Sequence, residues 1–237
     1  MEQSLTLTLD DGQPFSGRLT SAEKMVPGAS AMVLLAHGAA NTMDHPLLVY
    51  LCRELARSGF LCLRFNFPYS EAGRSKPDSQ TTLEATWRRV LEYVKTDPGI
   101  APRRVVAAGK SLGGRVASQM AAAGLLAVDG LIFYGYPLHP PGRKDTLRDA
   151  HLAAIQAPML FFAGTRDPFC DLDLMRPVCR RLKDRATLEI IDGGDHSFDP
   201  PAAAGPEARD QAYRQLIERS VQWIGALIDG RLGSSPK

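Results

Sequence analysis

Continuous apolar runs recur along this chain, and a segment with helical periodicity follows each of them. Such runs are typical of parallel strands, which are buried on both faces because helices pack against both sides of the sheet. The expected strands are Ala31–Ala36, Leu61–Phe65, Val105–Ala108, Leu131–Tyr134, Met159–Ala163 and Thr187–Ile191. The expected helices are Pro46–Ser58, Thr82–Thr96, Leu112–Ala123, Lys144–Ala157, Asp171–Leu182 and Glu207–Ile228. This alternation predicts an α/β fold with a mostly parallel, doubly wound sheet.

The segments outside this pattern are short. Alternation over Leu5–Leu9, a turn at Asp11-Gly12 and a second run over Phe15–Leu19 predict an antiparallel N-terminal hairpin at a sheet edge. The 237 residues fit one α/β domain. We expect this single domain to span residues 1–230 and residues 231–237 to form a frayed tail. Between the strands ending at Tyr134 and starting at Met159, only a proline-rich stretch and one crossover helix are expected, so we expect no cap domain.

Composition excludes several classes of partner. A formal net charge of +2 creates no strong field, so no nucleic-acid partner is expected. The first residues lack the pattern of a signal peptide, and no apolar stretch reaches the ~18 residues of a membrane span. We therefore expect a cytoplasmic protein without a membrane partner. The four cysteines show no C-x-x-C spacing, which favours buried thiols over disulfides or metal ligands.

A G-x-S-x-G motif, Gly109 to Gly113, directly follows one buried strand and precedes a helix rich in small residues. The motif is short and carries little weight alone; its place between strand and helix is what strengthens it. A turn this tight requires a strained backbone at Ser111 and glycines on both sides, and it presents the serine hydroxyl at the carboxyl end of the sheet. Ser111 is the candidate nucleophile.

A serine nucleophile requires a base and a group that orients the base. His196 lies in a glycine-containing loop after the last expected strand, whereas His37, His45, His139 and His151 fit structural or solvent-exposed roles. Asp167 follows the strand Met159–Ala163 and is the candidate acid. Asp171 and Asp173 are alternatives, although they also fit the start of a helix, where carboxylates accept hydrogen bonds from free N–H groups.

Further residues are expected around the nucleophile. The backbone N–H of Leu112, at a helix start, and that of Ala39, in the loop after Ala31–Ala36, are candidates for an oxyanion hole. Lys110 places a cation beside Ser111, where it could attract an acidic substrate or instead meet solvent or a carboxylate such as Glu71. Phe67 and Tyr69 follow the strand Leu61–Phe65 and could form a wall of a substrate pocket.

The segments LLAHGAA, GKSLGG, AGTRDPF and GGDHSF resemble, in order and position, the strand ends of α/β hydrolases. The segments RFNFPY and EAGR resemble the branch of small dienelactone-hydrolase-like proteins related to testis-expressed hydrolase-like proteins. This resemblance implies the α/β-hydrolase fold and esterase or thioesterase chemistry, with nucleophile, acid and base at Ser111, Asp167 and His196. True dienelactone hydrolases carry a cysteine as nucleophile, so lactone specificity is not implied.

The sequence therefore predicts a serine hydrolase that cleaves small ester or thioester substrates through an acyl-enzyme, with a small-molecule acyl compound as partner. The reaction needs no cofactor and no metal. The same three residues could also support acyl transfer or perhydrolysis. A non-catalytic protein-binding module is the alternative of another class, because the branch also resembles proteins with scaffold roles.

Overall fold

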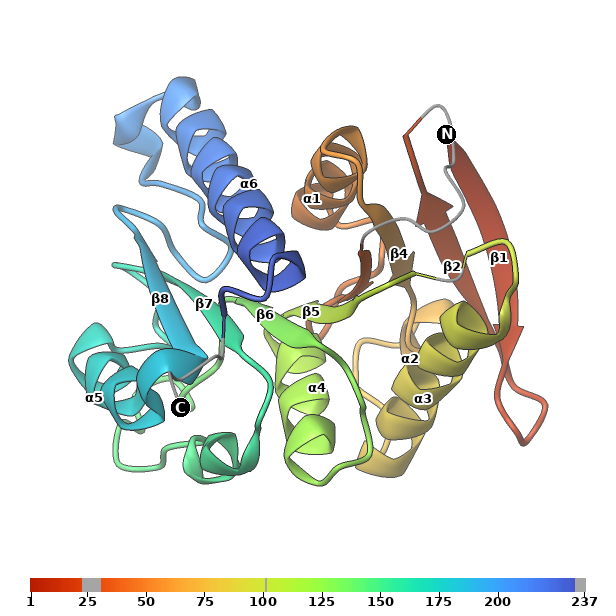
Figure 1. Ribbon diagram of the computed structural model, residues 1–237. Coiled ribbons are helices and arrows are strands. Elements are labelled where there is room, and N and C mark those ends of the chain that lie inside the picture. The colour runs from red at the N-terminus through yellow and green to blue at the C-terminus, as the bar shows by residue number, and fades with distance from the viewer. Residues whose placement is uncertain (23–30, 101, 233–237) are drawn as a thin grey trace.

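A single twisted sheet forms the centre of the protein (Figure 1). The computed structural model describes residues 1–22, 31–100 and 102–232, so most of the expected tail, residues 233–237, lies outside the described part. The sheet has eight strands in the order β1-β2-β4-β3-β5-β6-β7-β8. They are β1 Glu2–Thr8, β2 Pro14–Thr20, β3 Met32–Ala36, β4 Leu61–Phe65, β5 Val105–Lys110, β6 Gly130–Tyr134, β7 Met159–Gly164 and β8 Ala186–Ile191.

The pairing pattern matches the one expected from the sequence. β1 and β2 form the predicted antiparallel hairpin, and β2 pairs antiparallel with β4. From β4 to β8 every neighbouring pair is parallel. The carboxyl ends of β3 to β8 therefore meet at one edge, which is where ligands bind in sheets of this kind.

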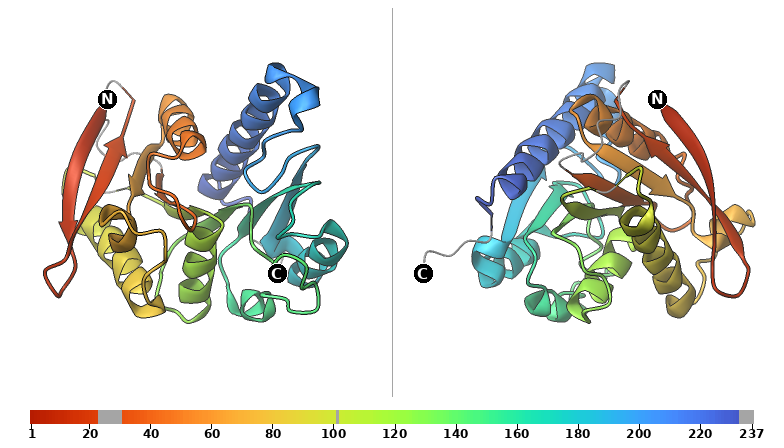
Figure 2. Two further views of the ribbon diagram at one scale, coloured as in Figure 1. Left: turned by 180° about the vertical axis from the view of Figure 1, so that it is seen from behind. Right: turned by 45° about the vertical axis from the view of Figure 1, so that its right-hand side comes forward.

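Helices cover both faces of the sheet and bury two separate cores. Figure 2 shows α1 and α6 together on one face and α3, α4 and α5 on the other. Alternate residues of β3 point to opposite sides: Leu34 joins the core under α3 to α5, and Val33 and Leu35 join the core under α1 and α6. The helices are α1 Pro46–Arg57, α2 Pro68–Glu71, α3 Gln80–Thr96, α4 Leu112–Ala122, α5 Leu172–Leu182 and α6 Pro206–Ile228.

Local signals at the helix starts explain why the helices begin where they do. Ser79 Oγ accepts a hydrogen bond from the Thr82 N–H at the start of α3, at 3.2 Å. Asp171 Oδ1 accepts one from the Asp173 N–H at the start of α5, at 2.8 Å. His45 Nδ1 does the same for α1 with the Leu47 N–H, at 3.3 Å. Each contact satisfies a backbone donor that has no partner within its helix.

The predicted helix Lys144–Ala157 is wrong. Only a short 3-10 helix, η1 Ala150–Ala154, forms there. Backbone groups that an α-helix would use have distant partners: the Arg148 N–H donates to the Leu138 carbonyl at 2.8 Å, and the Arg148 carbonyl accepts from the Tyr136 hydroxyl at 2.6 Å. The segment between β6 and β7 is thereby tied down beside the sheet, and Leu138 and Leu152 in it are fully buried.

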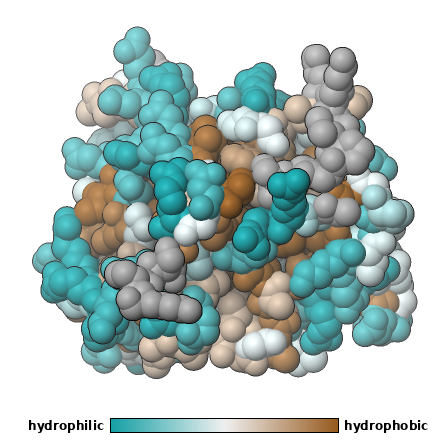
Figure 3. All heavy atoms as spheres, viewed as in Figure 1, coloured by the Kyte–Doolittle hydropathy of each residue, from teal (hydrophilic) through white to brown (hydrophobic). Residues whose placement is uncertain are grey.

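The surface on the face seen in Figure 1 is mixed in character. Figure 3 shows several separate apolar patches among hydrophilic residues on this face. Within residues 1–22, 31–100 and 102–232, no helix combines the length and the apolar character needed to cross a bilayer. Three of the four cysteines, Cys52, Cys62 and Cys170, are buried free thiols, as predicted, and Cys179 is half-buried.

Candidate functional site

The turn between β5 and α4 holds Ser111 in a strained conformation. Its backbone has φ 49° and ψ −113°, a region that residues with a side chain rarely occupy. The neighbouring glycines explain how the turn can be so tight. A Cβ on Gly109 would lie 2.3 Å from the Gly114 nitrogen, and one on Gly113 would lie 2.6 Å from the His37 carbonyl oxygen. Only glycine fits at these positions, so the sequence folds here into a sharp turn with Ser111 at its tip.

Asp167 and His196 form a hydrogen-bonded pair. His196 Nδ1 lies 2.9 Å from Asp167 Oδ1 and 2.8 Å from Oδ2. The Asp167 side chain has no exposed surface, and its Oδ1 also accepts from the Phe169 N–H at 2.8 Å. The alternative acid Asp171 is otherwise engaged: it begins α5 and forms an ion pair with Lys144, which lowers the pKa of the Asp171 carboxyl.

Glycines also bring the His196 loop onto the sheet. A Cβ on Gly164, the last residue of β7, would lie 2.2 Å from the Gly194 carbonyl oxygen. A Cβ on Gly135 would lie 3.3 Å from His196 Nδ1. The residue before Gly135, Tyr134, accepts a hydrogen bond from the Ser111 N–H at 3.3 Å. Ser111 and His196 therefore lie beside the same end of β6.

The second ring nitrogen of His196 has no partner. Nε2 is buried and has no hydrogen bond to any residue in the described part of the chain. No hydrogen bond thus joins His196 to Ser111 in this structure. Hydrogen bonds of this kind are often long without substrate and shorten in the complex.

The two predicted oxyanion donors belong to residues next to, or one residue removed from, the surroundings of Ser111. Leu112 is the first residue of α4, so its N–H has no acceptor within the helix. Gly38 packs directly on the nucleophile, since a Cβ there would lie 3.3 Å from the Ser111 Cβ. Ala39 follows Gly38 and is exposed. One predicted donor is thus the residue that follows the serine in the chain, and the other follows the glycine that packs on it.

Lys110 is buried, with only 4 % of its surface exposed. Burial lowers the pKa of its ammonium group, and the carboxylates of Asp167, Asp195 and Asp199 act in the opposite direction. These three acids belong to the loops that hold His196 and its partner. The contact with Glu71 considered above does not form, because Glu71 accepts hydrogen bonds from Ser16 and Asn66.

The structure does not support a pocket wall at Phe67 and Tyr69, because both side chains lie in the core with no exposed surface. Phe67 packs edge-on against Phe65, with ring centroids 5.6 Å apart, and also against His37, at 5.0 Å. The Tyr69 hydroxyl donates to the Gly38 carbonyl at 3.2 Å. These two residues therefore pack against the loop after β3 from the core side.

Four histidines have the structural roles that their positions predict. Each makes hydrogen bonds that tie loops or helix ends together: His37 to Gly38 and Phe67, His45 to Leu47, His139 to Pro140 and Asp171, and His151 to Ser118 and Tyr136.

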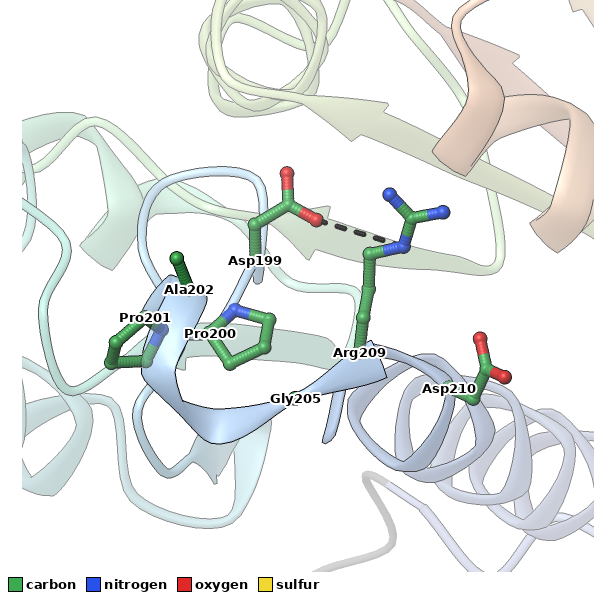
Figure 4. Close-up of a pocket in the computed structure, with 7 residues that line it drawn as sticks. All are labelled: Asp199, Pro200, Pro201, Ala202, Gly205, Arg209 and Asp210. Atoms are coloured by element: carbon green, nitrogen blue, oxygen red, sulfur yellow. Dashed lines mark ion pairs between the residues drawn. The ribbon is translucent and has the colours of Figure 1, made fainter. Parts of the chain in front are cut away.

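A cavity of about 510 Å³ adjoins the His196 loop (Figure 4). Its walls come from the segment after His196 and from the start of α6: Asp199, Pro200, Pro201, Ala202, Gly205, Arg209 and Asp210. Figure 4 shows the Asp199 carboxylate and the Arg209 guanidinium facing each other, with 4.0 Å between Oδ1 and Nε. Ser111, Asp167 and His196 are not among the residues that line it.

Three residues at the site were not foreseen from the sequence. Gly135 and Gly164 allow the close approach of the His196 loop, and Phe169 lies against the imidazole with ring centroids 4.4 Å apart. A glycine directly after each of two buried runs was a visible signal for the first two. Nothing in the sequence pattern distinguished Phe169.

Known proteins share the fold of this chain. A family model described as an alpha/beta hydrolase domain matches residues 29–225. A serine hydrolase without a lid from Xanthomonas campestris is 21 % identical, with 99 % of this chain and 97 % of that one covered and a TM-score of 0.68. A dienelactone hydrolase from Anabaena variabilis is 19 % identical, covers 94 % of this chain and 96 % of its own, and has a TM-score of 0.72.

A curated relative is similar over a shorter stretch. The quorum-quenching protein AidA of Acinetobacter baumannii is 32 % identical over 90 residues, which are 36 % of this chain. The match spans 29 % of that relative's length. The parallel sheet, the strained serine turn after β5 and the match over residues 29–225 lead to one conclusion: this chain belongs to the α/β-hydrolase family.

Proposed function

We propose that this protein is a serine hydrolase that cleaves small ester or thioester substrates through an acyl-enzyme intermediate. One observation carries the proposal. His196 has one ring nitrogen held by the buried Asp167 carboxylate. The other has no partner among the described residues, and the ring lies beside the end of β6, where Ser111 also lies. A histidine held in this way is a base with a fixed orientation, and the adjacent serine is the group that needs one.

In the first step, Ser111 Oγ attacks the substrate carbonyl carbon while His196 Nε2 takes the hydroxyl proton. Asp167 accepts the Nδ1 hydrogen bond, which fixes the tautomer and stabilises the imidazolium. The tetrahedral intermediate collapses when the bond to the leaving alcohol or thiol breaks, and His196 returns the proton to that group. Water then attacks the acyl-enzyme by the same route, which releases the acid and restores Ser111.

Negative charge develops on the carbonyl oxygen in both steps. The Leu112 N–H at the start of α4 and the Ala39 N–H in the loop after β3 are the donors proposed to stabilise it. The positive end of the α4 dipole acts in the same direction. This arrangement follows from the turn itself, because the residue after the nucleophile opens the helix.

The proposed preference for small acyl groups rests on the segment between β6 and β7. Leu138, His139, Leu152 and Ile155 from this segment are buried against the rest of the protein. A segment packed in this way does not cover a long acyl chain at Ser111. The lidless serine hydrolase from Xanthomonas campestris has a similar fold, which is consistent with an open site here.

Labelling with a fluorophosphonate tests the proposal without knowledge of the natural substrate. We expect the wild-type protein to gain the mass of one phosphonyl group at Ser111, and Ser111→Ala to gain none. Ser118→Ala is the matched control and should still be labelled, because Ser118 is a second serine on this side of the sheet that lies beside a histidine, with 2.8 Å between its Oγ and His151 Nε2. A wild-type protein that stays unlabelled would contradict the proposal and favour the non-catalytic binding module.

A further inference from the structure

The loop that carries Ala39 is supported by a chain of hydrogen bonds from the end of β4. The Phe67 N–H donates to His37 Nε2 at 3.0 Å. Because Nε2 accepts, the proton of the neutral ring is on Nδ1, and this Nδ1–H donates to the Gly38 carbonyl at 2.8 Å. Burial keeps this ring neutral by lowering the pKa of His37 to about 4.

The Gly38 carbonyl has a second donor. The Tyr69 hydroxyl lies 3.2 Å from the same oxygen, and the Tyr69 side chain has no exposed surface. Burial raises the pKa of this hydroxyl to about 12, so it remains a donor over the whole physiological range. The buried His37 ring and Tyr69 hydroxyl thus both donate to the Gly38 carbonyl, which therefore points toward the core.

Peptide planarity transmits this constraint to Ala39. The Gly38 carbonyl and the Ala39 N–H belong to one trans peptide group and point in opposite directions. With the carbonyl fixed toward the core, the N–H faces away from the core. Gly38 itself packs against Ser111, as the 3.3 Å distance from its would-be Cβ to the Ser111 Cβ shows.

We propose that Tyr69 and His37 are positioning residues of the oxyanion hole, which fix the Gly38–Ala39 peptide so that the Ala39 N–H is aimed at the developing oxyanion. The inference rests on the proposed serine hydrolase function. It gives Tyr69 a role that acts through the backbone and without contact to substrate. A donor that is fixed before the reaction costs no reorganisation in the transition state, which is why its support matters for kcat.

The test compares two Tyr→Phe variants. Tyr69→Phe keeps the ring and removes only the hydroxyl that holds the Gly38 carbonyl. Tyr136→Phe is the matched control, because Tyr136 is also buried and its hydroxyl also donates to a backbone carbonyl, that of Arg148, at 2.6 Å. Both variants should lose a small amount of thermal stability, because Tyr69→Phe loses one buried hydrogen bond and Tyr136→Phe loses one such bond together with a longer contact to His151, at 3.4 Å.

We expect Tyr69→Phe to lower kcat for p-nitrophenyl acetate about tenfold with KM nearly unchanged, and to weaken binding of an alkylboronic acid by a similar factor. The loss is smaller than the ~10²-fold or more for removal of a whole oxyanion donor, because His37 still holds the carbonyl. Tyr136→Phe should leave both quantities within about twofold, since its hydroxyl is bound to a different loop.

Two results would overturn this inference alone: a Tyr69→Phe protein with wild-type kcat, or equal losses of kcat in both variants. The failure of the proposed function is recognised separately, because the wild-type protein would then resist the fluorophosphonate, and the inference would fall with it. A wild type that is labelled, combined with an unaffected Tyr69→Phe, refutes only the role of Tyr69.

Discussion

Two histidines, His37 and His196, follow strands at the same edge of the sheet, and their surroundings differ in one respect. Both ring nitrogens of His37 are hydrogen-bonded, to the Gly38 carbonyl and to the Phe67 N–H, and the residue is fully buried. His196 has Nδ1 bound to Asp167, whereas Nε2 has no partner in the described part of the chain.

The difference distinguishes a histidine with a structural role from a histidine that can act as a base. A histidine with both nitrogens occupied joins two loops and has no site left for proton transfer. A histidine with one nitrogen oriented and the other free has the arrangement that a general base requires. The pattern of satisfied and unsatisfied atoms therefore distinguishes the two more clearly than position along the chain, since both follow a strand.

The largest expected effect is that of His196→Asn. The Asn amide can still donate to Asp167, but it cannot accept the serine proton. We expect kcat for p-nitrophenyl acetate to fall on the order of 10⁵-fold. The free energy of unfolding, from denaturant titration, should stay within about 1 kcal/mol of wild type. If the variant kept measurable turnover near the wild-type level, the contrast between the two histidines would have no catalytic meaning.

Asp167→Asn should reduce kcat on the order of 10⁴-fold, because an amide in that position favours the wrong tautomer of the imidazole. Asp171→Asn is the control. Asn caps a helix as well as Asp does, so kcat should change by about twofold at most. Steady-state kinetics on both variants decide the matter, and the reverse ranking would transfer the role of the acid to Asp171.

A smaller effect concerns stability and belongs to His37. Its pKa in the folded protein is about 4, compared with 6.5 for an unperturbed histidine. The unfolded chain therefore binds a proton in this interval that the folded protein does not, and stability falls as the pH drops from 6.5 to 4. The full loss is about 3 kcal/mol, because one pKa unit corresponds to ~1.4 kcal/mol.

His37→Gln removes this contribution, so its unfolding free energy should fall less steeply between pH 6.5 and 4 than that of wild type. Urea unfolding at several pH values gives the slope of the unfolding free energy against pH for each protein. The protonation of the carboxylates contributes equally to both slopes and cancels when one is subtracted from the other. Parallel slopes would show that His37 takes up its proton in the folded state without cost.

The smallest effect is expected for substrate length. No lid is proposed over Ser111, so methylenes beyond the first few should gain little of the ~0.8 kcal/mol that full burial provides. We expect kcat/KM for p-nitrophenyl esters to be highest from acetate to butyrate and several-fold lower for octanoate. A steady rise to octanoate would indicate that the cavity between Asp199 and Asp210 encloses the acyl chain.

Most of the fold could be predicted because the signals are local. The apolar runs fixed six strands, and five of six helices lie where their periodicity places them. The prediction of a helix over Lys144–Ala157 was wrong because Leu138 and Tyr136 bind the backbone of this segment, and a local pattern does not include those residues. Long-range partners decided the structure there.

The site shows the same division. That Ser111, Asp167 and His196 follow strands β5, β7 and β8 could be read from the sequence, because the carboxyl ends of parallel strands meet at one edge. The burial of Lys110, Phe67 and Tyr69 could not. For Phe67 and Tyr69 it depends on how the loop after β4 packs against the loop after β3, which is not encoded within a few residues.

The glycines under the His196 loop also determine how this protein can vary. Gly164 has the Gly194 backbone so close that any side chain would overlap it, whereas Gly142 has open space around it and is constrained only by its φ of 72°. Random substitution would therefore eliminate variants at Gly164 and retain many around Gly142. We therefore expect insertions to be tolerated at the exposed Gly142 turn and not at the end of β7.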